Sequence, residues 1–558
     1  MKVCLINSNL NERILPNSVI NFETGILSLG AVLENAGHEV KVVNLFRIFG
    51  KDRINNRGFS STAAASILKY SRGAGILGFN TRCDTYPVVL EVAKNCKTLD
   101  PGRVIVLGGP QSGSTDRETL RNFHFVDIIV RGEGERTFLE LTQALEKCPG
   151  AKLDGIPGIT FRRRGKIIRN KPRGLIKDLG SLPFPAYHLV EDFCLTPAEK
   201  KQGWIYVSTG RGCCRDCSYC AAAGMWQRRY RGRPPEDVIG EIDFLKKKYG
   251  VNRFYLGHDN FLIKQEGIAE ICRLLLKKKT GIEWACGLAA EGGDPVLLKI
   301  MSEAGCRRIF LGVESGSRRV QKAIRKNADF SNVADVLKKC RQYNISAVLF
   351  FTLGFPVEND EDLNATLMLA IKSRIMGDAY PYLHPLVPIA GTEVFLKNSG
   401  KMVLRKNWLN FSPLAGLIKR SSWCKSVIRR HPRVFSNFYA IRNKKNPSGF
   451  PSEAADIFSV FLSAYPASLF GALSGLRVSP LLFLRWFKSW ARERTPQAQM
   501  EKGVYPKVLL LDYFPVFLDN IYKKKNISMG PVSGILSLER RKIAGLCRIL
   551  RSKDGKNK

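Results

Sequence analysis

Short apolar runs alternate with amphipathic stretches over the first 148 residues. Five runs have the length and composition of buried strands: VCLIN, EVKVVNL, GILGFN, RVIVLGG and VDIIVRG. Between them, apolar residues recur at helical spacing, as in GILSLGAVLENAG and TFLELTQALEK. Because regular alternation of strand and helix is typical of a parallel sheet covered on both faces, residues 1–148 are predicted to form a doubly wound, Rossmann-like α/β domain.

A second series of strand–helix repeats occupies residues 201–392. Six apolar runs lie near residues 204, 253, 283, 307, 347 and 380, with helical stretches such as PEDVIGEIDFLKKKYG between them. This pattern predicts a partial (βα)6 barrel of the TIM type, with its chemistry at the carboxyl ends of the strands. Residues 149–200 are expected to form a connector that contains a hairpin, and residues 393–558 a helical C-terminal region.

The charge of the chain is strongly basic and unevenly distributed. The 558 residues include 88 Lys plus Arg against 49 Asp plus Glu, a net charge of +39. Residues 391–558 contain 31 basic and 9 acidic residues and carry +22 of it. Such a balance indicates an anionic partner, which could be a nucleic acid, a phospholipid surface or an acidic substrate. Because no nucleic-acid module is recognisable, nucleic acid ranks below the others.

One 20-residue window, residues 457–476, contains no charged residue and approaches the length of a membrane span. It also contains Pro466, two glycines and four serines. A buried helical hairpin is therefore favoured over an interfacial membrane segment, and both are favoured over a true span. The basic and aromatic stretch that follows, LLFLRWFKSWARER, suits an anionic lipid surface and a helical cap equally well, so peripheral membrane contact stays open.

The pattern of the 15 cysteines indicates a reducing environment. Four of them crowd into the segment from Cys213 to Cys220 and the others are scattered singly, unlike a disulfide framework. The N-terminal sequence MKVCLINSNL lacks the pattern of a signal peptide. A cytoplasmic location is expected, with membrane association as its variant.

The segment after the first barrel strand carries the strongest chemical signal. Cys213, Cys217 and Cys220 form a CxxxCxxC pattern. Three thiolates on one short loop can each bind an iron of a cubane cluster and leave the fourth iron without a protein ligand. A structural zinc site would need a fourth ligand, and no second CxxC pair stands nearby. A ferredoxin register starting at Cys214 lacks its last cysteine, and chance clustering of buried cysteines is the remaining alternative.

With Tyr219 before its last cysteine, this pattern resembles the signature of the radical S-adenosylmethionine (SAM) superfamily, and the resemblance extends from about residue 204 to residue 392. It implies a 4Fe-4S cluster bound by Cys213, Cys217 and Cys220, whose open iron binds the amino and carboxylate groups of SAM. Electron transfer from the cluster would cleave SAM to a 5′-deoxyadenosyl radical. An electron donor such as flavodoxin or ferredoxin is therefore implied as a partner.

Residues at further strand ends match SAM-binding positions of that superfamily. Glu314 and Ser315 stand in a segment similar to its GxESG motif, where both residues contact polar groups of SAM. Gly354 belongs to a segment that resembles the glycine-bearing stretch along the adenosine, and Asp259 is a candidate for binding the SAM amino group or the substrate. Each residue alone would equally well be a helix cap or a solvent-facing acid, and their common position at strand ends favours binding.

Glycines follow two strands of the N-terminal domain, at Gly108-Gly109 and at Gly132-Glu133-Gly134. Glycine after a strand is usually a turn residue, but ligands also bind at the carboxyl ends of such strands. With the flanking segments VIVLGGPQSGS and VDIIVRGEGERTFLEL, the region resembles the cobalamin-binding domain that precedes many radical SAM enzymes. The DxHxxG motif of other cobalamin proteins is absent from the loop NSNLNERILPN, and His38 is interpreted as structural. The resemblance implies cobalamin without a histidine ligand.

The two resemblances together imply a cobalamin-dependent radical SAM C-methyltransferase. In that reaction the deoxyadenosyl radical removes hydrogen from an unactivated carbon, and the substrate radical takes methyl from methylcobalamin. An oxidative cyclase or rearrangement enzyme, like the anaerobic Mg-protoporphyrin monomethyl ester cyclase, has the same domain order and is the alternative. A non-catalytic cobalamin or redox sensor is the hypothesis of another class. The substrate is expected to be a small molecule or lipid, such as a tetrapyrrole or a natural product, and no catalytic residue is assigned.

Overall fold

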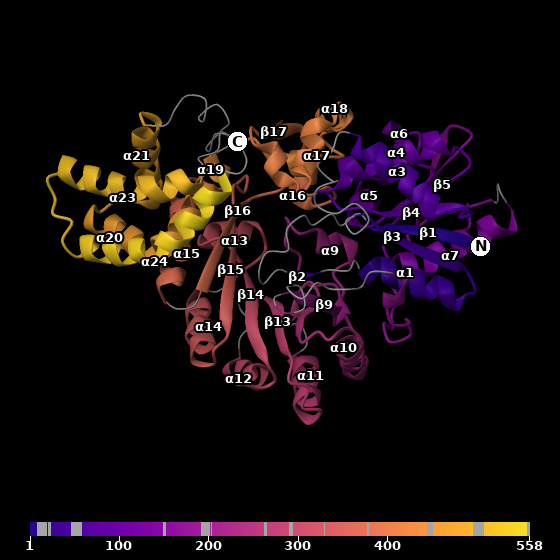
Figure 1. Cartoon of the computed structure of the whole chain (residues 1–558), viewed down its shortest axis with the longest axis horizontal. Helices are drawn as coiled ribbons and strands as arrows, with labels where there is room; N and C mark the ends of the chain where they lie inside the picture. The colour runs from indigo at the N-terminus through magenta and orange to yellow at the C-terminus, as the bar shows by residue number, and fades with distance from the viewer. Residues whose placement is uncertain are drawn as a thin grey trace. The chain divides into compact units, whose positions relative to one another are not determined.

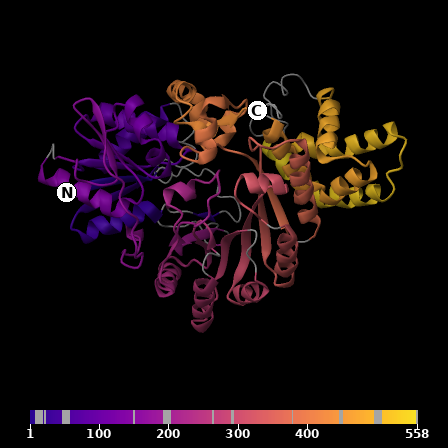
Figure 2. The same cartoon turned by 180° about the vertical axis from the view of Figure 1, so that it is seen from behind.

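The computed structural model divides the chain into two compact units, which are described separately (Figures 1 and 2). The first unit comprises Met1–Cys286, Val387–Leu404 and Trp408–Tyr439, and the second comprises Gly287–Leu386, Arg405–Asn407 and Ala440–Lys558. The structure describes all residues except 8–18, 21–23, 46–57, 149–151, 191–200, 202, 262–264, 290–293, 329, 377–378, 444–449, 495–506 and 555–558.

Five parallel strands form the centre of the N-terminal sheet, in the order β3-β1-β4-β5-β6. Their bounds are Lys2–Asn7 for β1, Glu39–Asn44 for β3, Ile76–Asn80 for β4, Val104–Gly108 for β5 and Ile128–Val130 for β6. The chain winds outward in both directions from β1, so the carboxyl ends of β1 and β4 form a topological switch point, where such sheets bind ligands. The predicted doubly wound domain is confirmed.

The predicted hairpin of the connector forms, but it belongs to this sheet. Strands β7 (Ile159–Arg163) and β8 (Lys166–Arg169) extend the sheet beyond β6 in antiparallel pairing. Ile159 and Phe161 lie two residues apart and are both buried in the core of the N-terminal domain, as the two-residue period of a strand requires. The hairpin therefore covers an edge that would otherwise be exposed beside β6.

Helices cover both faces of the N-terminal sheet. Helices α1 (Thr24–Asn35) and α7 (Gly134–Lys147) pack on one face, while α3 (Phe59–Tyr70), α4 (Tyr86–Leu99) and α6 (Asp116–Asn122) pack on the other. Along β1, Val3 and Leu5 face the first group, and Cys4 and Ile6 face the second. Full burial of each such Val, Leu or Ile side chain contributes about 1.5–3 kcal/mol. The short α5 (Pro110–Ser114) directly follows β5.

Part of the C-terminal region also belongs to the first unit. Helices α17 (Ala415–Arg420) and α18 (Ser422–Arg430) pack on α4, and their apolar side chains join the same core. Ser421, the N-cap of α18, donates a hydrogen bond of 2.7 Å to Glu91 of α4. The C-terminal region, expected as one helical part, is thus divided between the two units.

The six strands expected for the barrel are all present. In the first unit, β9 (Trp204–Ser208), β12 (Arg253–Gly257) and the start of β13 (Glu283–Ala289) run parallel to one another. In the second unit, β14 (Cys306–Glu314), β15 (Ser346–Leu353) and β16 (Ala379–Pro385) do the same. The helices between them are α10 (Pro235–Tyr249), α11 (Gln265–Lys277), α12 (Pro295–Glu303), α13 (Arg318–Ala323), α14 (Phe330–Gln342) and α15 (Asp360–Met376).

One strand of the barrel sheet comes from the N-terminal domain. The two-residue strand β2 (Val19–Ile20) pairs in parallel with β9, opposite Trp204 and Ile205. Nothing in the alternation of strands and helices signals this pairing, because β2 is too short to show a period. It ties the N-terminal domain to the first barrel strand within the first unit.

The rest of the second unit is helical. Its helices are α19 (Phe450–Ala464), α20 (Pro466–Gly475), α21 (Pro480–Arg492), α23 (Lys507–Lys524) and α24 (Pro531–Asp554), and α19 packs against β16. Further short elements of the described residues are η1 (Tyr187–Leu189), α16 (Glu393–Asn398), η3 (Ser399–Lys401), β17 (Met402–Leu404), η4 (Trp408–Phe411), η5 (Ser436–Phe438) and β18 (Tyr439–Ile441).

The uncharged window at residues 457–476 forms two helices joined at a sharp bend. Among the described residues, no single helix meets the length and hydropathy of a membrane span, whereas residues 453–464 and 466–475 meet them as a pair bent by 109°. Phe458, Phe461, Leu469 and Leu473 of this pair are at most 2% exposed. The structure therefore agrees with the buried helical hairpin.

Aromatic rings hold these helices together. Phe514 of α23 is fully buried, and its ring centroid lies 4.5 Å from that of Phe461, 4.9 Å from that of Tyr465 and 6.2 Å from that of Phe483. Aromatic pairs at these separations stabilise by about 0.5–1.5 kcal/mol beyond the burial of their area. Phe514 thus joins three helices of the second unit.

We expect Phe514→Ala to lower the free energy of unfolding of the C-terminal helices by about 3–5 kcal/mol, because it leaves a cavity among rings that cannot close around it. Hydrogen exchange of peptides from α19, α21 and α23, followed by mass spectrometry, measures the local loss. Val516→Ala on the same helix is the control, since Val516 is 54% exposed. Equal protection in the two variants would contradict the packing described.

Candidate active site

A cavity of about 810 Å³ lies in the first unit, at the carboxyl ends of strands from both sheets. The N-terminal sheet contributes residues 78–80, 108–110 and 130–135, and the barrel strands contribute Tyr206, Ser208, Tyr255, His258 and Asp259. The last two residues of α9 (Ala221–Met225) and the two residues after it, 226 and 227, line the same space. A cavity of this size is within the range of small-molecule and cofactor sites.

Glycines form the wall of the cavity on the side of the N-terminal sheet. A Cβ added at Gly108 or Gly132 would meet no atom within 4 Å, so at both positions the backbone itself faces open space. Gly109 has φ 101°, and a Cβ there would lie 2.6 Å from Oδ1 of Asn80. The glycines thus let a bulky ligand approach the backbone closely, and Gly109 also permits the turn after β5.

All five residues predicted for the corrin site, Gly108, Gly109, Gly132, Glu133 and Gly134, line this cavity. Glu133, however, is already paired within the protein. Its carboxylate accepts hydrogen bonds from Arg211, Arg231 and the backbone N–H of Ile176. Its negative charge is therefore directed to neighbouring arginines and not to the open cavity, and these partners hold the pKa of Glu133 below its usual value despite burial.

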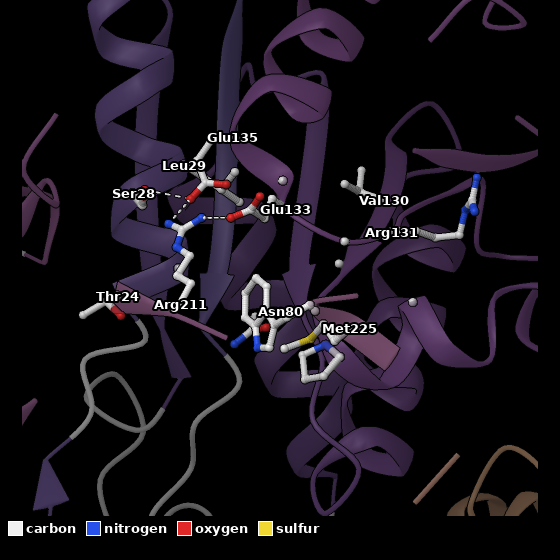
Figure 3. Close-up of a pocket in the computed structure, with 18 of the residues that line it drawn as sticks. Thr24, Ser28, Leu29, Asn80, Val130, Arg131, Glu133, Glu135, Arg211 and Met225 are labelled. Atoms are coloured by element: carbon white, nitrogen blue, oxygen red, sulfur yellow. Dashed lines mark hydrogen bonds and ion pairs between the residues drawn. The ribbon is translucent and has the colours of Figure 1, made fainter. Parts of the chain in front are cut away.

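Arg211 and Glu135 are among the charged residues of the cavity that were not singled out from the sequence. Arg211 donates to Glu133 at 2.7 Å and to Glu135 at 2.6 Å, and Ser28 donates to Glu135 at 3.0 Å (Figure 3). Glu135 follows the predicted Gly132-Glu133-Gly134 segment and Arg211 precedes the cysteine segment, but no spacing rule links residues 76 positions apart. Only the tertiary structure brings them together.

The cysteine segment is a loop inside a small hairpin. Strands β10 (Gly210–Arg211) and β11 (Arg231–Gly232) pair in antiparallel fashion, and the three predicted ligands and α9 lie on the chain between them. Cys217 is 7% exposed, Cys213 and Cys220 are half-buried, and Cys214 is exposed. The N–H of Cys220 donates to the carbonyl of Cys217 at 3.1 Å, which fixes one turn of the loop.

Within the described residues, no three Cys, His, Asp or Glu side chains converge on a point that would hold a single metal ion. Cubane clusters place each thiolate on a different iron, so their ligands are spaced more widely than those of one ion. Burial raises the pKa of Cys213 and of Cys220, so the thiols hold their protons until a metal displaces them. Three cysteines at this spacing suit iron and sulfide chemically, and the one carboxylate of the loop, Asp216, pairs with Arg228 at 2.7 Å.

Asp259 holds the loop from the barrel side. Its carboxylate accepts the backbone N–H of Gly212, next to Cys213, at 3.0 Å, and it also lines the cavity. Displacement of water by the surrounding protein raises the pKa of Asp259. Tyr219 is half-buried and lies outside the cavity lining. Asp259 is therefore the predicted residue that links the loop to the cavity.

His258, beside Asp259, is a cavity residue that sequence reasoning did not select. Its Nδ1 lies 2.8 Å from Oγ1 of Thr209, its ring packs 4.8 Å from that of Tyr230, and Nε2 has no hydrogen-bond partner in the part of the chain described. Burial lowers the pKa of His258 to about 4, so the imidazole is neutral at pH 7. Among described residues, no histidine of the N-terminal sheet lines the cavity.

The interpretation of His38 as structural agrees with its position. It is 7% exposed at the turn between α1 and β3, and its Nδ1 lies 3.2 Å from the amino group of Met1. The loop NSNLNERILPN, whose lack of a DxHxxG motif motivated that interpretation, lies almost wholly outside the described residues.

Three predicted SAM-binding residues lie in the second unit. Glu314 ends β14 with φ 69°, and its carboxylate accepts a hydrogen bond of 2.8 Å from Thr352 of β15. Lys326 lies 3.6 Å from the same carboxylate. A left-handed glutamate is costly, and such strain is concentrated at functional sites. Ser315 is fully buried and its hydroxyl bonds to Thr366, so this side chain shapes the turn.

Gly354 follows β15 in a turn held by a buried acid. Its φ is 96°, and its N–H and that of Phe355 both donate to Oε2 of Glu358. Glu358 is fully buried, and its Oε1 has no partner among described residues. Desolvation raises the pKa of Glu358 to about 8, so the folded protein keeps this acid largely protonated at pH 7.

Two known protein families match parts of the chain. The model of the B12 binding domain matches residues 20–142, and that of the radical SAM superfamily matches residues 207–370. Their order is that of the two sheets described above. The first match includes cavity residues 78–80, 108–110 and 130–135, and the second includes Ser208, Tyr255, His258 and Asp259.

Similar curated proteins include methyltransferases and a cyclase. The uncharacterized methyltransferase PH0819 of Pyrococcus horikoshii is 29% identical over 62% of this chain and 75% of its own length. The cytidylyl-2-hydroxyethylphosphonate methyltransferase of Streptomyces wedmorensis is 26% identical over 64% of this chain and 73% of its own length. The anaerobic magnesium-protoporphyrin IX monomethyl ester cyclase of Synechocystis sp. is 28% identical over 61% of this chain and 66% of its own length.

Solved structures share the fold. The radical S-adenosylmethionine methyltransferase TsrM of Kitasatospora setae, with cobalamin and a [4Fe-4S] cluster, has a TM-score of 0.62 at 17% identity and covers 83% of this chain and 88% of its own. The cobalamin-dependent S-adenosylmethionine radical enzyme OxsB has a TM-score of 0.59 at 15% identity and covers 100% of this chain and 81% of its own. The similarity extends over the N-terminal sheet, the barrel strands and the C-terminal helices.

The chain therefore combines a B12-binding domain with a radical SAM domain. It belongs to the cobalamin-dependent radical SAM enzymes, among which its relatives include methyltransferases and cyclases. The predicted fold class and the family resemblance are confirmed.

We expect Gly108→Leu to weaken binding of hydroxocobalamin at least about ten-fold, because the new side chain would project into the open space that Gly108 borders. Equilibrium titration followed by the visible absorbance of the corrin measures the affinity. Gly155→Leu is the matched control, since a Cβ at Gly155 also meets no atom within 4 Å but lies outside the cavity lining. Unchanged affinity in Gly108→Leu would place the corrin elsewhere.

We expect Glu358→Gln to change how stability depends on pH. A folded-state pKa of about 8, above the usual 4.5, gives the acid a stabilising effect that is complete below pH 4.5 and is lost as the pH rises through 8. The glutamine side chain of the variant does not titrate, so the melting temperature of the variant minus that of wild type should increase from pH 5 to pH 8 and then level off. Exposed Glu361→Gln, in the first turn of α15 just after Glu358, is the control. A constant difference would refute the buried, protonated acid.

Proposed function

We propose that the protein transfers a methyl group from SAM, by way of cobalamin, to an unactivated carbon of a small-molecule substrate. One observation carries the proposal: a single cavity of the first unit is lined by the glycine-bearing strand ends of the B12-binding domain and by the first strand ends of the radical SAM domain. A carrier of the methyl group and the site of radical formation would then face a common space. Such an arrangement lets a substrate reach both groups without leaving the cavity.

The corrin is assigned to the glycine wall. Gly108, Gly109, Gly132 and Gly134 line the cavity with backbone, which allows the broad face of a macrocycle to approach. Glu133 is given a positioning role, since its carboxylate is paired with arginines. No protein histidine is assigned to cobalt from the N-terminal sheet.

The cluster is assigned to Cys213, Cys217 and Cys220, and SAM to the strand ends around it. Tyr219 shapes the loop. Asp259 holds Gly212 and reaches the cavity, where its carboxylate can accept a hydrogen bond from an ammonium group. For Glu314, Ser315 and Gly354 of the second unit, a role in SAM binding is proposed from the motifs in which they stand, with the backbone of Ser315 in place of its engaged hydroxyl.

When bound, the cluster supplies the electron that cleaves SAM, and the corrin carries the methyl group. The protein's own residues bind and orient these groups, and the buried, neutral His258 offers a hydrogen-bonding atom to an uncharged part of the substrate. We propose a flavodoxin or a ferredoxin as electron donor, because such carriers are acidic and this chain carries +39. Contact with a lipid surface would fall to the basic helices, since the apolar side chains of α19 and α20 are already buried.

A labelled methyl group tests the proposal without knowledge of the substrate. The protein is purified without oxygen, reconstituted with iron, sulfide and hydroxocobalamin, and given titanium(III) citrate and SAM carrying a trideuterated methyl. Mass spectrometry is expected to find the labelled methyl on the recovered corrin, and chromatography to find 5′-deoxyadenosine. Cys217→Ala should reduce deoxyadenosine to background, while Cys214→Ala, at the exposed neighbouring cysteine, should retain it.

The remaining outcomes separate the alternatives. Deoxyadenosine without label on the corrin would favour a cyclase or rearrangement enzyme, as in the relatives that close a ring. Bound corrin with neither product would leave a sensor. Equal loss in Cys217→Ala and Cys214→Ala would contradict the assignment of the cluster ligands.

A further inference from the structure

Four charged side chains join the segment at residues 131–135, which follows β6 and is called the corrin-side loop, to the hairpin that contains the cysteine loop. Arg211 donates to Glu133 at 2.7 Å and to Glu135 at 2.6 Å, and Arg231 donates to the two oxygens of Glu133 at 2.9 and 2.8 Å. Figure 3 shows the fork of Arg211 between the two glutamates. We call Glu133, Glu135, Arg211 and Arg231 the four-residue ion-pair network.

The network is buried and its charges balance. The side chains of Glu133 and Glu135 are 4% and 5% exposed, and those of Arg231 and Arg211 are 10% and 20% exposed. Buried charges are costly unless they are paired with good geometry, and here two positive charges meet two negative ones. Removal of one member therefore leaves an uncompensated charge in the interior.

The two arginines would repel each other without the glutamates. Arg211 and Arg231 are directly opposed across the β10–β11 pair, where like charges destabilise a sheet. Glu133 accepts from both of them, and the N–H of Ile176 completes its coordination at 2.7 Å. The hairpin thus closes around a carboxylate that belongs to the other domain.

Both ends of the network are adjacent to a cofactor region in the chain. Glu133 is the N-cap residue of α7 and Glu135 lies in its first turn, while Gly132 and Gly134 line the cavity. Arg211 is two residues before Cys213, and Arg231 closes the hairpin after α9. The network thus connects the corrin-side loop to a point two residues of backbone away from Cys213.

We propose that the four-residue ion-pair network couples the two cofactor regions, so that occupancy of the cysteine loop by its cluster tightens the binding of the corrin, and the reverse. The inference rests on the proposed function only in taking a corrin and an iron–sulfur cluster as the ligands. Arg211 and Glu135 act as positioning residues, since they bind neighbouring side chains and not the reacting atoms. By linkage, the effect of each ligand on the other must be equal.

The test measures this coupling in the full-length protein. The dissociation constant of hydroxocobalamin is determined by absorbance titration without oxygen, once with and once without the reconstituted cluster, and the two constants give a coupling ratio. We expect the cluster to tighten binding about five-fold or more in wild type. Glu135→Gln, which keeps the shape and removes one charge, should bring the ratio close to one.

Two further variants separate coupling from simple loss of stability. Arg211→Lys keeps the charge but loses the fork that spans two carboxylates, so its ratio should also fall. Arg253→Gln breaks an ion pair with Glu283 on strands of the first unit and lies outside the cavity lining, so it should lower stability while leaving the ratio unchanged. Should Glu135→Gln fail to fold, Arg211→Lys carries the comparison.

The outcomes distinguish this inference from the proposed function. A wild-type ratio of one, or an unchanged ratio in both network variants with full iron content, would overturn the coupling alone. A wild-type protein that binds no corrin or assembles no cluster would instead overturn the proposed function.

Discussion

Parallel strands carry their carboxyl ends to one edge of a sheet, and the first unit contains two such edges that border one cavity. This constraint determines where chemistry can occur, because backbone amides, glycine turns and the polar side chains of short loops all gather there. Gly108, Gly132 and Asp259 belong to different sheets or strands, yet all three line the same space. The four-residue ion-pair network then holds the β10–β11 hairpin, whose loop contains Cys213, Cys217 and Cys220.

The elements outside the two sheets support this arrangement. The β7–β8 hairpin and helices α17 and α18 extend the core of the N-terminal domain, so its strands are buried on both faces. In the second unit, α19 packs on β16, and Gly354 lies against Pro451 at the start of that helix. The C-terminal helices therefore stabilise a strand end assigned to SAM. This helps to explain why a region without recognisable motifs accompanies the catalytic domains.

Much of the fold and of the site could be predicted from the sequence because both depend on local patterns. The strand–helix alternation is local, and so are CxxxCxxC and the glycines after strands. The pairing of β2 with β9 could not be predicted, since two residues show no periodicity. The contact of Arg211 with Glu135 joins distant residues, and the burial of Glu358, four residues after Gly354, depends on packing that only the folded chain creates. The environment of His258 likewise follows from Tyr230 and Thr209, which are distant in sequence.

The central claim is that one cavity brings cobalamin and the cluster together, and paramagnetic resonance tests it most directly. Spectra are recorded for protein loaded with cobalamin alone in its paramagnetic state, with the reduced cluster alone, and with both. The account predicts that the corrin signal relaxes faster, or splits, when the reduced cluster is present in the same molecule. A spectrum of the doubly loaded protein that equals the sum of the two single spectra would contradict a shared cavity.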